Sequence, residues 1–129
     1  MLLCDAAQSV QGKLYILGGG WTQVQTHGNP IPMALALQIS VPWDMANQRL
    51  AVKAVLLTSD GELVDPGVGP VEASTHLEVG RPAGLEKGTP LQAMLAVNAG
   101  ALPLSPGRYV WHIEIDGEIK AQAPFQVLN

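Results

Sequence analysis

The chain has 129 residues, of which 47% are hydrophobic and 14% are charged, and its formal net charge is −4. This composition excludes an intrinsically disordered chain, no apolar run reaches the roughly 18 residues of a membrane-spanning helix, and the seven scattered basic residues form no stripe for a nucleic-acid backbone. We therefore expect one soluble globular domain over residues 1–129, with one core, no nucleic-acid partner and no membrane association.

The amino-terminal segment MLLCDAAQ indicates a cytoplasmic protein. It has no basic region, no long apolar stretch and no small-residue cleavage site, so it is unlike a secretion signal. Cys4 is the only cysteine, which excludes an intramolecular disulfide. A lipoprotein signal would need a longer apolar stretch before Cys4, so this residue is better explained as the buried thiol of a first strand.

The stretch GKLYILGGGW, from Gly12 to Trp21, raises the question of a phosphate-binding loop. Such loops place backbone N–H groups at the start of a helix, with a Gly-Lys-Ser/Thr or G-x-G-x-x-G spacing. Neither spacing is present, and the residues WTQVQTHGNPIPM that follow do not favour a helix. We expect Gly18–Gly20 to end a strand with a bulge, a bend or a close approach of another backbone, and Trp21 to pack over it.

The middle of the chain alternates apolar and polar residues with a period of two, which is typical of strands with one buried face. In the run PMALALQISV the larger apolar face holds Leu35, Leu37, Ile39 and Val41. Strands are also expected at 50–59 and 71–79. The dipeptide Asp60-Gly61 between them is suited to a tight hairpin turn.

The last third of the chain repeats this pattern after a loop rich in glycine and proline. Alternation predicts strands at 91–97, 108–115 and 118–129, with Asp116-Gly117 as the turn between the last two. Trp111 lies among the apolar residues of its strand, so we expect it to fill the space between two sheets.

These elements predict an all-β fold. About eight strands with frequent turn signals and no amphipathic helix favour an antiparallel β-sandwich of two sheets. The one expected exception is a short helical turn near residues 42–48 (PWDMANQ), with Asp44 as its cap.

Four segments, in this order, resemble a known family: GKLYILGGGW, VPWDMAN with LLTSDGELV, LEVGRPAGLEKGTPL, and LSPGRYVWHIEIDGE followed by PFQV. Nearly the whole chain is similar to a bacterial family of small proteins that is known only as a domain of unknown function. The resemblance implies an immunoglobulin-like β-sandwich, and it implies no activity, cofactor or site residue. The segment PGRYVW is also similar to the tyrosine corner of sandwich domains, with Tyr109 as its tyrosine.

The candidate binding residues are Arg81, Trp43 and Trp21. The loop GRPAGLEKGTP (80–90) interrupts the alternation, and Arg81 is its only side chain that can grip a carboxylate with two donors. Trp43 and Trp21 lie at strand ends, where an exposed indole can anchor a partner. A structural role is the alternative for all three, with Arg81 bound to backbone carbonyls and both indoles packed in the core.

Catalytic and metal sites have weaker support. His27, His76 and His112 lack a second ligand at a metal-binding spacing, although His112 shares a strand face with Glu114. Each Asp-Gly loop has too few oxygens for calcium unless two loops meet, and no G-x-S-x-G sequence marks a nucleophilic serine. We therefore predict no cofactor, no metal and no catalytic residue.

Three functions remain open. The leading hypothesis is a non-enzymatic binding or protein-interaction module that contacts an unidentified protein through loop 80–90 and the Trp43 region. The second is a homo-oligomeric structural element, because small apolar residues occupy secondary strand faces: Ala34, Ala36, Ala93 and Ala96. The third is a small hydrolase or metal-dependent enzyme, which needs His112 or His76 to meet carboxylates in a cleft.

Overall fold

The computed structural model describes residues 1–129 and contains ten β-strands. They are β1 (Leu2–Cys4), β2 (Ala6–Val10), β3 (Lys13–Leu17), β4 (Gln23–Gln25), β5 (Ile31–Val41), β6 (Leu50–Thr58), β7 (Glu72–Leu77), β8 (Leu91–Leu102), β9 (Gly107–Ile115) and β10 (Glu118–Leu128). One 3-10 turn, η1 (Trp43–Met45), connects β5 to β6. The all-β class and the single helical turn are confirmed. The predicted cap is wrong, because Pro42 occupies the cap position and no side chain bonds there, while Asp44 lies inside the turn.

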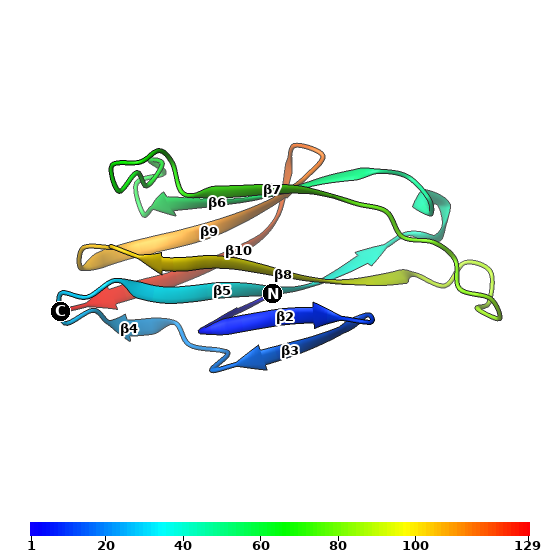
Figure 1. Cartoon of the computed structure of the whole chain (residues 1–129). Helices are drawn as coiled ribbons and strands as arrows, with labels where there is room; N and C mark the ends of the chain where they lie inside the picture. Colours follow the sequence, from blue (N-terminus) through cyan, green and yellow to red (C-terminus); the bar gives the residue numbers. More distant parts are fainter.

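The strands form two packed sheets and a separate hairpin (Figure 1). One sheet has the order β4-β10-β9-β6-β7, the other has the order β1-β5-β8, and β2 pairs with β3. All these pairs are antiparallel except β4 with β10, which is parallel. The prediction of two antiparallel sheets with about eight strands is therefore wrong in its sheet count, its strand count and one edge pair. Alternation locates strands, whereas their partners depend on contacts between distant segments.

The main core lies between the two larger sheets. Strand β5 supplies alternate apolar residues from one side, and β6, β9 and β10 supply the facing layer. The largest contribution comes from Trp111, which is 1% exposed and packs in this core as its strand pattern predicts. The residues that these four strands contribute to the main core are Ile31, Met33, Leu35, Leu37, Ile39, Val41, Leu50, Val52, Ala54, Leu56, Trp111, Ile113, Phe125 and Val127.

The middle of the other face of β5 is covered by the β2–β3 hairpin, which forms an outer layer below β5 and β8 in Figure 1. Ala34 and Ala36 are buried in this second cluster, whereas Ala93 packs in the main core. The other buried members of the second cluster are Cys4 and Ala7, and the partly buried Leu14, Ile16 and Ala96 pack against it. Small side chains allow the hairpin to approach β5 closely, so the alanine face is covered within one chain.

Polar contacts fasten the hairpin to β8. The Asn98 side chain donates to the Ala7 carbonyl at 2.9 Å and accepts from the Ala7 N–H at 3.4 Å. The Ser9 hydroxyl donates to the carbonyl of Met94 at 2.9 Å. Because an isolated two-stranded hairpin is only marginally stable, these bonds and the alanine cluster hold it in place.

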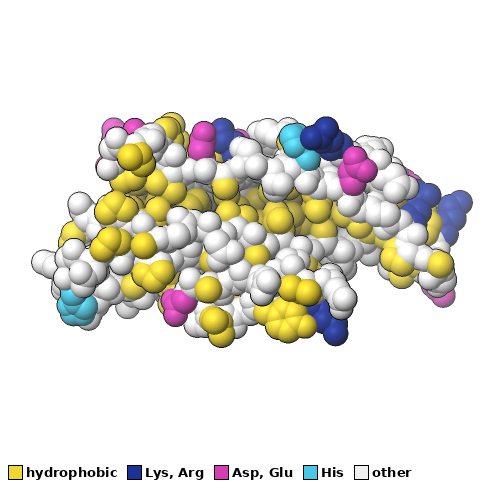
Figure 2. Space-filling model, viewed as in Figure 1, with side chains coloured by type: hydrophobic (Ala, Val, Ile, Leu, Met, Phe, Trp, Pro, Cys, Tyr) yellow, Lys and Arg dark blue, Asp and Glu magenta, His cyan; other side chains and the backbone are white.

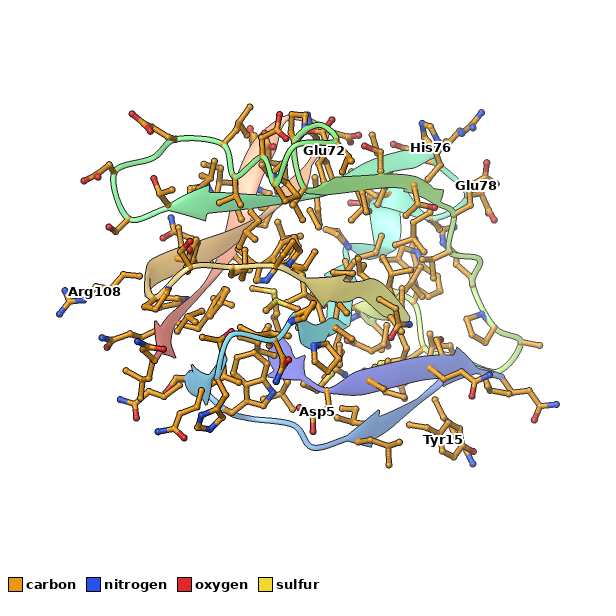
Figure 3. The ribbon with its side chains drawn as sticks, turned by 60° about the vertical axis from the view of Figure 1, so that its left-hand side comes forward. Asp5, Tyr15, Glu72, His76, Glu78 and Arg108 are labelled. Carbon is orange, nitrogen blue, oxygen red and sulfur yellow. The ribbon has the colours of Figure 1, made fainter.

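The predicted bend at Gly18–Gly20 follows β3. Gly18 has a φ of +59°, and a Cβ atom added to it would collide with the carboxylate of Asp5. Figure 3 shows the Asp5 side chain pointing toward this segment. The N–H of Gly20 donates to the Leu3 carbonyl at 2.8 Å. Positive φ and the close approach of Asp5 explain the glycine, and no helix follows that would receive a phosphate.

The two Asp-Gly turns behave differently. Asp116 and Gly117 have φ values of +50° and +85° and join β9 to β10 in a hairpin, as predicted. At Asp60-Gly61 the chain also reverses, but the returning segment forms only an isolated bridge between Leu57 and Leu63. The next full strand starts at Glu72, so the second dipeptide makes a turn without a regular hairpin.

We expect the thiol of Cys4 to be inert in the folded protein. The side chain is fully buried, and its Sγ lies 3.4 Å from the Ala34 carbonyl oxygen. Burial and the nearby Asp5 carboxylate raise the pKa of the thiol above its usual range. A chromogenic disulfide reagent should therefore react with the native chain only through opening of the hairpin layer, at least about a hundredfold more slowly than in urea. Immediate labelling without denaturant would contradict this expectation.

The raised pKa of the Cys4 thiol also makes the free energy of unfolding depend on pH. As pH rises, the thiol of the unfolded chain ionises before the buried thiol, so the free energy of unfolding should fall at alkaline pH. Urea unfolding of the parent and of Cys4→Ala, at neutral pH and above the usual pKa of a thiol, measures this effect. A similar alkaline loss of stability in both proteins would assign it to other groups.

Candidate binding site

One long side of the sandwich is incompletely closed. Strand β1 pairs with β5 only at residues 34–36, and β4 pairs with β10 only at residues 126–128. Residues 37–41 of β5 and 118–122 of β10 therefore have no neighbouring strand on this side. Between them lies a cavity of about 600 Å³, which we call the edge cleft.

The edge cleft is mainly apolar, since nine of its 15 lining residues are hydrophobic. They are Met1, Leu37, Ile39, Val41, Met45, Leu50, Ile113, Ile115 and Ala121. Five of them are buried members of the main core, namely Leu37, Ile39, Val41, Leu50 and Ile113, so the cleft reaches the margin of the core. Met1 and Met45 have flexible, polarisable side chains that adapt to ligands of different shape. This surface can accept apolar side chains in an orientation set by two rigid sheets.

Charged groups line the cleft at the β9–β10 turn. The ammonium of Lys120 lies 2.9 Å from the carboxylate of Glu118 and lowers the pKa of that carboxyl. The carboxylate of Asp116 accepts the Ala51 N–H at 2.9 Å. Two carboxylates and one ammonium leave this part of the lining with a net charge of −1. The amino-terminal ammonium of Met1, which also lines the cleft, balances this charge, so the charged groups of the whole lining sum to zero.

The turn η1 borders the edge cleft through Met45 and its cap residue Pro42. From loop 80–90, the Nε and Nη2 groups of Arg81 donate to the Trp43 carbonyl at 3.2 and 2.7 Å. The same guanidinium lies 4.4 Å from the centroid of the Trp43 ring. In Figure 1 this loop extends beyond the sheets at the end where β5 connects to β6. The structure thus brings Arg81 and Trp43 together, with Arg81 binding a backbone carbonyl as in the structural alternative.

Replacing Arg81 should loosen η1. We expect Arg81→Ala to lower the free energy of unfolding by about 1 kcal/mol, because two hydrogen bonds and the stacking on Trp43 are lost at an exposed site. Arg81→Lys should recover less than half, since an ammonium lacks the two-pronged geometry. Lys87→Ala, in the same loop, is the control for urea unfolding. Equal stability of the Arg81→Ala and Lys87→Ala proteins would show that the contact does not hold the turn.

Trp21 lies apart from this pair. It precedes β4, at the end of the sandwich where the chain terminates, whereas η1 lies at the opposite end (Figure 1). Its ring packs edge-on against Phe125, with centroids 5.9 Å apart, and its Nε1 is buried without a hydrogen-bond partner. The core alternative therefore describes its position. A role of Trp21 in binding stays a prediction.

The histidines do not meet carboxylates. His76 Nδ1 lies 3.2 Å from the Nη2 group of Arg49, and Figure 3 shows His76 at the outer surface of the sheet. The two ion pairs of the chain join Lys53 to Glu72 and Lys120 to Glu118, and neither includes a histidine. The enzyme hypothesis therefore has no assembled histidine–carboxylate pair in this structure and stays a prediction.

Sequence reasoning missed the edge cleft. Its apolar residues belong to strands whose alternation predicts a closed core, and the pattern of one strand does not say whether its neighbour is long enough to cover it. The only available signal was the difference in length between two neighbouring strands. An eleven-residue strand, β5, is flanked on this side by the three-residue strand β1.

Together these features define a β-sandwich protein with an added hairpin and an apolar cleft at one edge. The model of a family described as a family of unknown function, DUF6941, matches residues 1–128, so the chain belongs to this family. The predicted membership of a family of unknown function is thus confirmed. No curated protein and no solved structure matches the chain. None of its helical structure is long and apolar enough to cross a membrane.

Proposed function

We propose that this protein is a non-enzymatic protein-interaction module that binds apolar side chains of a partner protein in the edge cleft. One observation carries the proposal: about 600 Å³ of mainly apolar space opens where both sheets lack an edge strand. Ligand sites in proteins are typically concave and mostly apolar, with a few polar groups that set orientation. Asp116, Glu118 and Lys120 supply such groups here.

The proposal includes the pair that sequence reasoning selected. Arg81 fixes the carbonyl of Trp43, and the same turn places Met45 in the cleft lining. We therefore propose that Arg81 positions one end of the site, and that the Trp43 region forms its border. Loop 80–90 would then act on binding through η1.

Peptide selection tests this proposal without knowledge of the natural partner. Random peptides displayed on phage are selected on the full chain, and their dissociation constants are measured for the parent and for Ala121→Phe, which places a ring in the cleft. We expect binding at least about tenfold weaker, because the added ring occupies ligand space. Ala73→Phe, on the exposed strand β7 of the same sheet, is the matched control.

The outcomes separate the candidate sites. Unchanged binding by Ala121→Phe would exclude the edge cleft. Loss of binding in Arg81→Ala, with full binding by Ala121→Phe, would move the site to loop 80–90. If Ala121→Phe fails to fold, Met45→Trp places a larger ring in the cleft from η1 and gives the same comparison.

We also propose that the sandwich is of the immunoglobulin type. In support, β6, β9 and β10 are neighbours in one sheet, and β5 and β8 are neighbours in the other. The Tyr109 hydroxyl donates to the carbonyl of Ser105, four residues upstream, at 2.7 Å, which is the hydrogen bond of a tyrosine corner. A bacterial source and a cytoplasmic location stay predictions.

Self-association is the second candidate function, and the outer face of the β2–β3 hairpin favours it. Tyr15, Leu17 and Val10 are 57%, 70% and 39% exposed there. Apolar side chains are exposed over this part of the surface in Figure 2, and Tyr15 points away from the molecule in Figure 3. Exposed apolar patches are typical of association surfaces. Sedimentation of the parent and of Leu17→Ser over a range of concentrations tests it, and a parent chain that remains monomeric would exclude it.

A further inference from the structure

We infer that the ligand of the edge cleft is an extended peptide that adds to the three-stranded sheet as a new strand beside residues 37–41 of β5. Its alternate apolar side chains would fill the cleft. This inference rests on the proposed function and specifies the form of the ligand. It follows from the direction of backbone groups, the protection of the edges of β10 and β8 and the shape of the cavity.

The open part of β5 presents unused backbone groups. The Leu3 carbonyl accepts the Gly20 N–H at 2.8 Å, so the backbone groups of Leu3 point away from β5 and those of Leu2 point toward it. Leu2 is opposite Ala36, which therefore directs its N–H and C=O toward β1. Because this direction alternates along a strand and β5 has no bulge beyond residue 34, Gln38 and Ser40 direct theirs toward the open side.

The open edge of β10, across the cleft, is blocked against pairing. Its register shifts between Ile119 and Ala121, and Lys120 at this irregularity carries a charge. The Gln126 N–H donates to Thr22 on the β4 side, so by alternation the backbone nitrogens of Pro124 and Gln122 lie on the same side. Pro124 has no N–H to donate there. Bulges, lysines and prolines are the devices that prevent strand addition to a sheet edge.

The free edge of β8 is partly occupied by the hairpin. The hydroxyl of Ser9 donates a hydrogen bond to the Met94 carbonyl at 2.9 Å, and the Asn98 side chain forms hydrogen bonds with the backbone of Ala7. Residues 37–41 of β5, in contrast, contain no proline, no charged residue and no bulge. This segment is therefore the edge in the sandwich that lies open beside an apolar cavity.

The cavity favours a peptide as the occupant over a second copy of β5. Peptide residues opposite Leu37, Ile39 and Val41 would point to the same face as these residues, into the edge cleft. A second copy's β5 already buries its own apolar side chains in its own core, so its edge would leave the cavity empty. We expect the peptide pattern apolar-x-apolar-x-apolar, with no charged residue among the inward positions.

Three matched glutamine-to-proline substitutions test the inference, with a peptide selected on the full chain as the probe. Gln38→Pro removes the N–H that faces the open side of β5 and places a ring there, without breaking the β5–β8 ladder. Gln122→Pro makes the same change at the open edge of β10, and Gln92→Pro makes it at the free edge of β8. We expect Gln38→Pro to weaken binding about tenfold or more, and the other two to change it less than about threefold.

Amide hydrogen exchange of the unmodified protein gives a second readout that needs no variant. Saturation with the peptide should slow exchange at Gln38 and Ser40 at least about tenfold, because their N–H groups enter a strand ladder. Unchanged binding by Gln38→Pro, or unchanged exchange at both amides, would overturn strand addition. If Ala121→Phe still abolished binding, the proposed function would survive that result.

The same experiments would also detect a second copy of the chain on the open edge of β5. A parent chain that dimerises as its concentration rises, with Gln38 and Ser40 protected in the dimer and monomeric behaviour in Gln38→Pro, would place a second copy on this edge. That result would overturn the peptide as the occupant. Loss of binding in Gln92→Pro alone would assign strand addition to β8 and would equally contradict the inference.

Discussion

Trp111→Ala should lower the free energy of unfolding by about 3–5 kcal/mol. Trp111 is 1% exposed and packs between the two larger sheets, against residues of both. Removing its indole leaves a cavity that rigid strands cannot fill, because β9 is held on one side by β6 and on the other by β10. Urea unfolding followed by circular dichroism measures the change, since the substitution also removes a fluorescent group.

Trp111→Phe is the matched control for this prediction. The indole Nε1 of Trp111 is buried without a hydrogen-bond partner, and an unpaired buried donor costs about 1–3 kcal/mol. Phenylalanine removes this donor while it keeps most of the apolar volume, so we expect its stability to lie within about 1 kcal/mol of the parent. An equal loss in both variants would show that the N–H group has a partner in solution.

Ala34→Leu should destabilise the protein by about 1–3 kcal/mol and detach the hairpin layer. Ala34 is fully buried where the hairpin covers β5, and it lies opposite Cys4 in the β1–β5 pair. Three additional carbon atoms have no space there unless β2 and β3 move away. The thiol of Cys4, buried in the same cluster, should then react faster in the native protein, which makes thiol labelling the most direct measurement.

Ala73→Leu, on the exposed strand β7, controls for the same change in side chain. We expect its unfolding free energy to remain within about 0.5 kcal/mol of the parent and its thiol to stay protected. If Ala34→Leu behaved in the same way, the hairpin would not be packed on the alanine face. The alanine face of β5 would then be free to contact a second copy of the chain, as the self-association hypothesis first assumed.

Local chemistry predicted several elements because it acts over a few residues. Asp116-Gly117 makes its hairpin because both positions need positive φ, and Gly18 ends β3 for the same reason. The alternation of β5 and β9 correctly located Trp111 and Ile39 in the core. Asp60-Gly61 shows the limit of this reasoning, because a turn dipeptide reverses the chain but does not ensure that the following residues form a strand.

The candidate site was predicted only in part. Arg81 and Trp43 were selected from a loop and a strand end, and the structure joins them beside the edge cleft. Trp21 was selected on the same grounds and packs against Phe125 at the other end of the sandwich. Position at a strand end does not decide which way an indole turns, since that depends on the apolar partners that the fold brings near it.

The sequence by itself determined the all-β class, most strands and the family, because alternation and turn residues act locally and the ordered segments span nearly the whole chain. Only the tertiary structure decided that β2 and β3 leave the sandwich to cover Ala34 and Ala36, and that β1 and β4 pair with only part of β5 and β10. A strand's own residues specify which face is apolar. What covers that face, or leaves it open, is set by the packing of segments far apart in the chain.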